Sequence, residues 1–177
     1  MKRIAIVGCG GAGKSTLARR LGSLLGIDVI HLDSHFWRPG WIETPAEEWA
    51  IRQRGLLERE SWIADGNYGG TLELRFVPAD TILFLDLPRR ICLWRVLRRR
   101  LAYAGESRPD VPAGCREQID LEFLRWIWRF PRHSRPHLVA ALERHREGRR
   151  VEVLRSGREV ARFLDSLADP AARHGAV

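Results

Sequence analysis

A glycine-rich segment near the start of the sequence has the residue types and the spacing of a loop that binds nucleotide phosphates. Residues 8–15 read Gly-Cys-Gly-Gly-Ala-Gly-Lys-Ser, and glycines let a backbone curl so that its N–H groups point at phosphate oxygens. Lys14 would reach the β and γ phosphates of ATP, and the Ser15 hydroxyl would bind Mg²⁺. The predicted nucleotide-binding residues of this segment are Gly8, Gly10, Gly11, Ala12, Gly13, Lys14, Ser15 and Thr16.

The residues on either side supply the strand and the helix that such a loop needs. Residues 3–7 form a short apolar run rich in β-branched residues, which is typical of a buried parallel strand. Residues 14–25 place four leucines on one helical face, and Gly26 can end the helix. The amino-terminal end of this helix would add its partial positive charge to the phosphate site.

Strands and helices alternate along the rest of the chain. Apolar runs predict further strands at 28–33, 62–67, 81–86 and 150–154. Helices are expected at 45–60, in a short turn ending at residue 75, from residue 88, at 117–130, at 136–147 and from residue 156. Two of them begin with capping boxes, Thr44-Pro45-Ala46-Glu47 and Ser156 with Glu159. The alternation predicts an α/β fold with a parallel sheet and right-handed crossovers.

The composition limits the class of protein. At 177 residues with 45% hydrophobic residues, the chain is long enough for one well-packed domain and too short for two ordinary ones. We expect this domain to span residues 1–168 and the end, 169–177, to be frayed. No apolar run approaches the ~20 residues of a membrane-spanning helix, and the first residues lead directly into a strand, so a cytoplasmic protein is expected. Three cysteines without paired or metal-type spacing predict reduced thiols.

The charge leaves two classes of ligand open. A formal net charge of +8 with a pI near 10.6 is typical either of nucleic-acid binding or of a pocket built for polyphosphates. The basic residues cluster around the expected phosphate site, and the sequence contains no nucleic-acid-binding motif. We therefore expect small-molecule partners, while a nucleic-acid-associated P-loop ATPase or regulator is the alternative.

Short motifs along most of the chain give a more specific indication. Besides the loop, they are His31-Leu32-Asp33, Phe36-Trp37, Pro39-Gly40-Trp41, Trp62-Ile63, Asp65-Gly66-Asn67-Tyr68, Phe84-Leu85-Asp86, Arg108-Pro109-Asp110, Gly114-Cys115 and Trp126-Ile127-Trp128. Over residues 3 to about 165 the sequence resembles the nucleoside-monophosphate-kinase branch of P-loop proteins. More closely, it is similar to the adenylate-kinase-like bacterial group labelled DNA topology modulation proteins.

The resemblance implies a fold and an activity. The fold would be a three-layer P-loop sandwich whose five parallel strands follow the order 2-3-1-4-5, with an acceptor-side insertion at 34–60 and a lid at 104–118. The activity would be transfer of the γ-phosphoryl group of ATP, with Mg²⁺, to a small acceptor. Two acceptor classes stay open, a nucleoside monophosphate and a hydroxyl-bearing metabolite. The oligomeric state is also open.

Two aspartates compete for the role of magnesium ligand. Asp65, followed by Gly66, stands where adenylate kinases end their third strand with Asp-Gly, and a carboxylate there can hold Mg²⁺ through its water shell. Asp86 also follows an apolar run, but it is expected to cap the helix that starts at Pro88. The sequence then departs from adenylate kinases, which carry Phe-Pro-Arg after this glycine. Arg75 is the substitute candidate for the missing acceptor-phosphate arginine.

Asp33 and two tryptophans are the candidates for the acceptor side. Asp33 follows the second strand, where hydroxyl-phosphorylating relatives such as shikimate and gluconate kinases carry an acceptor-contacting aspartate. It could accept or orient the acceptor proton as a general base, or it could cap a turn. Trp37 and Trp41 could stack on a planar acceptor such as a base, or form a small hydrophobic core under the insertion.

Arginines are expected on the nucleotide side and in the lid. By resemblance, Arg95 would lie against adenine and Arg99 would reach the phosphates, where spreading negative charge must be stabilised. Arg108 and Arg116 fall in the lid, whose closure would exclude water, and Arg108 is a further candidate for binding the acceptor; the alternative is that both are ordinary solvated loop arginines. The predicted catalytic residues are therefore Lys14, Asp33 and Arg99. Trp126 and Trp128 cannot share one helical face, so one is expected in the core and the other at a lid or interface contact.

Overall fold

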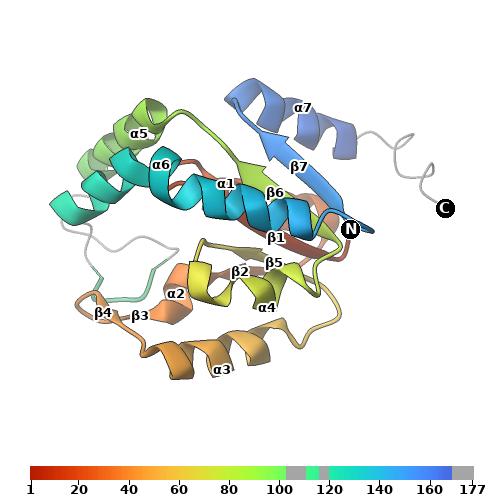
Figure 1. Cartoon of the computed structure of the whole chain (residues 1–177), viewed down its shortest axis with the longest axis horizontal. Coiled ribbons are helices and arrows are strands. Elements are labelled where there is room, and N and C mark those ends of the chain that lie inside the picture. Colours follow the sequence, from red (N-terminus) through yellow and green to blue (C-terminus); the bar gives the residue numbers. More distant parts are fainter. Residues whose placement is uncertain (103–110, 116–119, 169–177) are drawn as a thin grey trace.

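The computed structural model describes residues 1–102, 111–115 and 120–168 and has an α/β architecture (Figure 1). Five strands form one sheet, in which every neighbouring pair is parallel. They are β1 (Arg3–Gly8), β2 (Val29–His31), β5 (Trp62–Asp65), β6 (Thr81–Leu85) and β7 (Arg150–Leu154). The spatial order is β2-β5-β1-β6-β7. The labels differ from the expected numbers because two short strands lie outside this sheet, and counting its five strands alone gives 2-3-1-4-5.

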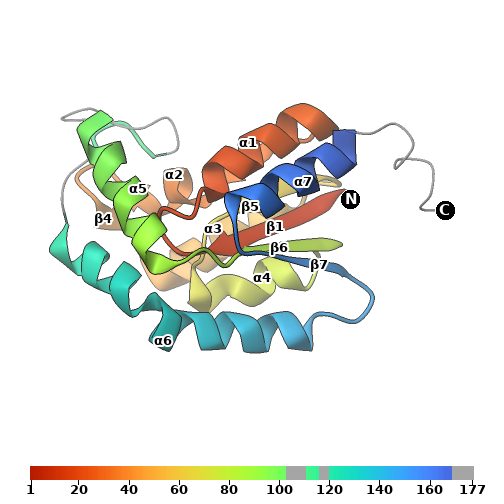
Figure 2. The same ribbon diagram turned by 90° about the horizontal axis from the view of Figure 1, so that it is seen from above.

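Helices cover both faces of the sheet (Figure 2). They are α1 (Lys14–Leu25), α2 (Leu32–Phe36), α3 (Ala46–Leu57), α4 (Leu72–Phe76), α5 (Arg89–Ala102), α6 (Leu121–Arg144) and α7 (Gly157–Ala168), with a 3₁₀ turn at Gly69–Thr71. Figure 2 shows α1 and α7 on one face and α4 and α6 on the other. The expected α/β fold, a five-stranded parallel sheet between two layers of helices, is therefore confirmed.

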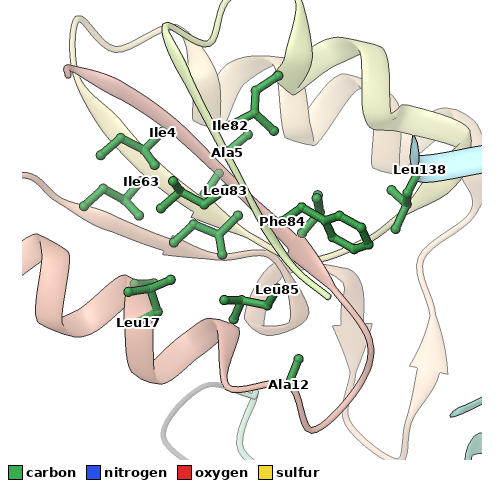
Figure 3. Packing of buried hydrophobic residues seen from close by; sticks show 14 of the residues in the cluster. Ile4, Ala5, Ala12, Leu17, Ile63, Ile82, Leu83, Phe84, Leu85 and Leu138 are labelled. Atoms are coloured by element: carbon green, nitrogen blue, oxygen red, sulfur yellow. The ribbon is translucent and has the colours of Figure 1, made fainter. Parts of the chain in front are cut away.

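The core lies between the sheet and these helices. Ile4, Ile63, Leu83 and their neighbours in the central strands are completely buried, as near-continuous apolar runs in a doubly covered parallel sheet should be. Along β6, Phe84 points toward Leu138 of α6, whereas the next residue, Leu85, points to the side of α1 (Figure 3). Burying a side chain of this size contributes about 1.5–3 kcal/mol to the free energy of folding. Many such side chains pack around the central strands, and this packing holds the carboxyl edge of the sheet in place.

The insertion expected at 34–60 contains the last three residues of α2, a small hairpin and α3, and α2 itself begins at Leu32. The hairpin pairs β3 (Trp37–Arg38) with β4 (Ile42–Glu43) in antiparallel register. The expected capping role of Thr44 is wrong, because its hydroxyl donates to the carbonyl of Phe36 and α3 begins after Pro45 without a side-chain cap. The Ser156–Glu159 capping box is confirmed, since the Glu159 N–H donates to Ser156 Oγ at 3.2 Å.

The helical region after the lid differs from the expectation of two helices at 117–130 and 136–147. One helix, α6, runs through Pro131 and Pro136. Residues on its inner face are buried against the sheet: Ile127, Phe130, Leu138, Ala141 and Leu142. This packing spans both prolines and outweighs the local cost that each imposes on a helix.

Two further findings concern the chain as a whole. Cys9, Cys92 and Cys115 are buried and unpaired by disulfides. Within the described ranges, no helix combines the length and the apolar character needed to cross a membrane.

Candidate active site

The glycine-rich segment connects β1 to α1 at the carboxyl edge of the sheet. Its backbone uses the left-handed region at Gly11 (φ 78°) and Gly13 (φ 100°), which glycine adopts without steric cost. The first turn of α1 has no side-chain cap, so its orphan N–H groups and helix dipole are directed at whatever lies in the loop. Ala12 is buried, and Thr16 lies exposed in the first turn of α1. This geometry fits a phosphate group.

The loop is packed too closely for larger residues at two of its glycines. A Cβ at Gly8 would lie 2.5 Å from the carbonyl oxygen of Leu85 in β6. A Cβ at Gly11 would overlap the carbonyl of Cys92 in α5. The loop is therefore held between the central strands and α5, which fixes the directions of its N–H groups.

Two of the three predicted cations of the nucleotide side, Lys14 and Arg95, contact the loop. Lys14 Nζ donates to the carbonyls of Gly8 and Cys9 at 3.0 and 3.1 Å, so its ammonium sits at the centre of the loop. Arg95 of α5 donates to the carbonyl of Ala12 at 3.0 Å. Arg99, half-buried one turn further along α5, shares the helix face of Arg95.

Ser15 and Asp65 come together beside the loop. Asp65 ends β5, the neighbour of β1 in the sheet, and the Ser15 hydroxyl donates to its Oδ2 at 2.7 Å. The other carboxylate oxygen, Oδ1, lies 2.5 Å from Nδ1 of His31, the residue opposite Asp65 on β2. Hydroxyl and carboxylate oxygens are suitable Mg²⁺ ligands, since this ion commonly takes only one or two protein ligands and fills its shell with water and phosphate oxygens.

Asp86, the competing candidate, has a different partner. Both of its carboxylate oxygens accept from the guanidinium of Arg135 in α6, each at 2.8 Å. This hydrogen-bonded pair raises the pKa of Arg135 above its usual value. The role of helix cap that we expected for Asp86 is therefore wrong, because its carboxylate ties α6 to the end of β6.

Asn67 is a site residue that sequence reasoning did not assign. Its Oδ1 accepts from the N–H of Gly8 at 2.9 Å, which ties the segment after β5 to the first glycine of the loop. The available signal was its position directly after Asp65-Gly66, at the carboxyl edge where parallel strands collect functional groups.

Arg75 does not lie where an acceptor phosphate could reach it. The side chain is completely buried, Nη2 donates to the carbonyl of Asn67, and Nε and Nη1 have no hydrogen-bond partner. Burial lowers the pKa of Arg75 to about 10. The expectation that Arg75 binds the acceptor phosphate is therefore wrong for this arrangement, in which it braces the segment after β5.

Asp33 lies in α2 and is half-buried. The hydroxyl of Tyr68 donates to Asp33 Oδ1 at 2.5 Å. The ring of Tyr68 packs on Phe36 and Trp49, with ring centroids 4.6 and 5.0 Å apart, and burial raises the pKa of its hydroxyl. Tyr68 is next to Asn67, so the carboxylate of Asp33 is connected to the phosphate-binding loop through two adjacent residues.

Trp37 and Trp41 contact each other in the small hairpin. Their rings meet edge to face with centroids 5.4 Å apart, and Trp37 also meets Phe36 at 4.9 Å. These contacts favour the small hydrophobic core over a stacking platform for a planar acceptor.

Part of the predicted lid touches the insertion. Within 111–115, the carbonyl of Gly114 accepts from the N–H of Gly40, and the Cys115 thiol lies 3.3 Å from the carbonyl of Arg38. The predicted lid arginines, Arg108 and Arg116, lie outside the described residues.

Comparisons with known proteins bear on the fold. A comparison with protein-family models found no match, and neither did a comparison with curated protein sequences. Among solved structures, the chain is similar to a shikimate kinase from Acinetobacter baumannii in complex with shikimate, at 17% identity and a TM-score of 0.59, over 100% of this chain and 96% of that one. It is also similar to a deoxyadenosine kinase from M. mycoides with bound dATP, at 12% identity and a TM-score of 0.51, over 96% of this chain and 100% of that one. At these identities the similarity shows the fold, which is that of P-loop kinases. Membership of the topology modulation group stays a prediction.

Proposed function

We propose that this protein transfers the γ-phosphoryl group of ATP, in the presence of Mg²⁺, to a hydroxyl group of a small molecule. The observation that carries the proposal is the 2.7 Å contact between Ser15 and Asp65 beside a phosphate-binding loop. Burying a carboxylate at the edge of a glycine turn is costly unless it is hydrogen-bonded. A hydroxyl and a carboxylate held together at this place are therefore better explained by a bound nucleotide and Mg²⁺ than by the turn alone.

The residues at the loop suit both ATP and Mg²⁺. The loop N–H groups and Lys14 would hold the phosphates, and Arg95 and Arg99 would stabilise negative charge that shifts during transfer. Ser15 and Asp65 would hold Mg²⁺, which when bound neutralises charge on the β and γ phosphates. His31 keeps the Asp65 carboxylate oriented by its hydrogen bond to Oδ1.

Asp33 is the proposed catalytic group on the acceptor side. Its carboxylate, oriented by Tyr68, could accept or direct the proton of the acceptor hydroxyl as transfer proceeds. We favour a hydroxyl-bearing metabolite over a nucleoside monophosphate for two reasons. Arg75 is buried and bonded to Asn67, and the two hairpin tryptophans pack on each other instead of presenting a flat face.

An acceptor screen tests this function. ADP formation would be measured with Mg²⁺ and ATP against a panel of hydroxylated metabolites that includes shikimate, and in parallel against nucleoside monophosphates. We expect at least one hydroxylated compound to raise ADP formation above the rate with water alone. Lys14→Ala should lose ATP binding or turnover while its circular dichroism spectrum stays that of the parent, because the ammonium supplies charge from a half-buried loop. Unchanged ATP affinity and turnover in the folded variant would refute the site.

A further inference from the structure

Two aromatic side chains at the beginning of α6 lie directly against the phosphate-binding loop. A Cβ built on Gly10 would be 2.6 Å from Cζ and 3.0 Å from Cε2 of Phe123, and 3.3 Å from Cζ3 of Trp126. Real Cβ atoms essentially never lie within 3.0 Å of another heavy atom, so a larger residue at Gly10 would require the Phe123 ring to move. Gly10 itself lies outside the left-handed backbone region, so its backbone conformation does not by itself require glycine, and the rings are the neighbours that a Cβ would meet first.

The two rings form a supported layer. Phe123 and Trp126 are one helical turn apart, and their planes are stacked at 12° with centroids 5.8 Å apart. Trp126 also meets Phe130 edge to face at 5.4 Å, and Phe130 is buried in the core. The layer is therefore fixed by packing on the sheet side of α6.

Apolar rings in this place have a specific chemical consequence. They offer no charge to a phosphate, but they cover a loop whose next residues would hold the phosphates of ATP. Water competes with any acceptor for the γ-phosphoryl group, and enzymes that transfer this group exclude it from the site.

We propose that Phe123 and Trp126 form an apolar barrier over Gly10 that keeps water from the phosphoryl group and so favours transfer to the acceptor over hydrolysis. This inference rests on the proposed function. It also assigns Trp126 a role at the loop. The sequence alone did not show which of Trp126 and Trp128 packs inward.

Trp128 supplies a matched control on the same helix. It is 47% exposed, and the guanidinium of Arg89 lies over its ring at 3.8 Å from the centroid. Removing this ring changes a surface contact and leaves the side of α6 that faces the loop intact.

The first test measures hydrolysis without any acceptor. Phe123→Ala and Trp126→Ala should each raise Mg²⁺-dependent ADP formation in buffer by about tenfold, equivalent to a barrier lower by ~1.4 kcal/mol. Affinity for a non-hydrolysable ATP analogue, measured by calorimetry, should stay within about twofold of the parent, a difference of ~0.4 kcal/mol. Trp128→Ala should change neither quantity, and Phe123→Leu replaces the alanine variant if the latter does not fold. Unchanged hydrolysis in both loop-facing variants would overturn the barrier.

The second test needs no nucleotide. Gly10→Ala should lower the melting temperature, because its methyl group meets the Phe123 ring, and the loss should shrink in the Phe123→Ala background where that methyl has room. Additive losses would place the ring away from Gly10 and overturn the inference. If the parent chain bound no ATP, the proposed function would fail and the barrier with it. If the parent transfers phosphoryl groups but the variants behave like it, the barrier alone fails.

Discussion

Asp65 is held at both carboxylate oxygens, one by Ser15 and the other by His31. A carboxylate that is 4% exposed and fixed in this way is a preorganised oxygen donor at the edge of the loop. Asp86 is equally well bonded, but its partner is Arg135, a structural one. The hydrogen-bond partners therefore favour Asp65 as the magnesium ligand and Asp86 as a structural residue, a choice that their similar sequence contexts left open.

Asp65→Asn should chiefly weaken the dependence of activity on Mg²⁺. An amide oxygen is a poorer ligand than a carboxylate, and the NH₂ group must face either Ser15 or His31. A magnesium titration of ADP formation should show a half-saturating concentration raised by about tenfold or more, which corresponds to ~1.4 kcal/mol.

Asp86→Asn is the control for this experiment, because it should leave the magnesium titration unchanged. It should lower the free energy of unfolding by roughly 1 kcal/mol, since the paired Arg135 is partly exposed and the charge-assisted bonds are screened. The reverse pattern in the two variants would transfer the metal role to Asp86.

Asp33→Asn should slow phosphoryl transfer far more than it weakens ATP binding. Loss of a positioned general base typically costs on the order of 10²- to 10⁴-fold in rate. An asparagine oxygen can still accept the Tyr68 hydroxyl, so the fold should be kept. The measurement is the rate of transfer to an acceptor found in the screen, beside ATP affinity by calorimetry. Unchanged transfer would leave Asp33 as a residue that anchors Tyr68.

At the scale of elements, local patterns predicted strands well and helix ends less well. The apolar runs that form β1, β5 and β6 are completely buried, as is typical of a parallel sheet covered on both faces. Pro131 and Pro136 misled the prediction for α6, because a local rule cannot weigh the apolar face that the sheet covers. Asn67 and Arg75 likewise depend on partners far away in the sequence, which no spacing rule reveals.

The short helix α2 should carry a pH-dependent part of the stability. Burial, followed by the positive charge of Arg52, lowers the pKa of His35 below its usual 6.5. In the unfolded chain His35 titrates normally, so below its ordinary pKa the unfolded state binds more protons than the folded state. The contribution of neutral His35 to the free energy of unfolding is therefore fully present above about pH 6.5. It is lost as the pH falls from there through the lower pKa that His35 has in the folded state.

Urea unfolding at about pH 7.5 and about pH 5.5 measures this effect. His35→Gln should reduce the loss of unfolding free energy between the two pH values. His133→Gln, at an exposed position on α6, should leave that difference as in the parent. An equal pH dependence in His35→Gln and the parent would contradict the linkage.

At the scale of the whole molecule, the five-stranded parallel sheet and its order followed from the alternation of elements and the family resemblance. The site required more, because it is assembled from β1, β2, β5, α1, α2, α5 and α6. The proximity of Ser15 and Asp65 follows from their predicted role at one Mg²⁺ site, but only the packed structure shows that α6 covers Gly10 or that Asn67 contacts Gly8. Motif spacing identifies residues that belong to one loop, whereas contacts between loops depend on tertiary packing.

The net charge of +8 keeps a nucleic-acid-associated ATPase as the rival function. Some basic residues of the described surface are paired with carboxylates: Arg38 with Glu48, Arg59 with Asp28 and Arg144 with Glu73. Each pair occupies an arginine that would otherwise be open to a phosphate backbone, while the net charge of +8, which already counts these carboxylates, is unchanged.

We therefore expect only weak binding to mixed-sequence duplex DNA, readily competed by ATP or free polyphosphate. The measurement is fluorescence anisotropy of a labelled duplex over a series of salt concentrations, with and without ATP and Mg²⁺. Each DNA phosphate that the protein neutralises contributes about −0.9 to the slope of log affinity against log salt, so a few contacts predict a shallow slope. Lys14→Ala separates the two modes, because it should remove competition by ATP while leaving backbone contacts elsewhere in place. Submicromolar affinity at about 0.15 M salt that nucleotide does not affect would show that the basic surface serves DNA, and would replace small-molecule phosphorylation as the explanation of the charge.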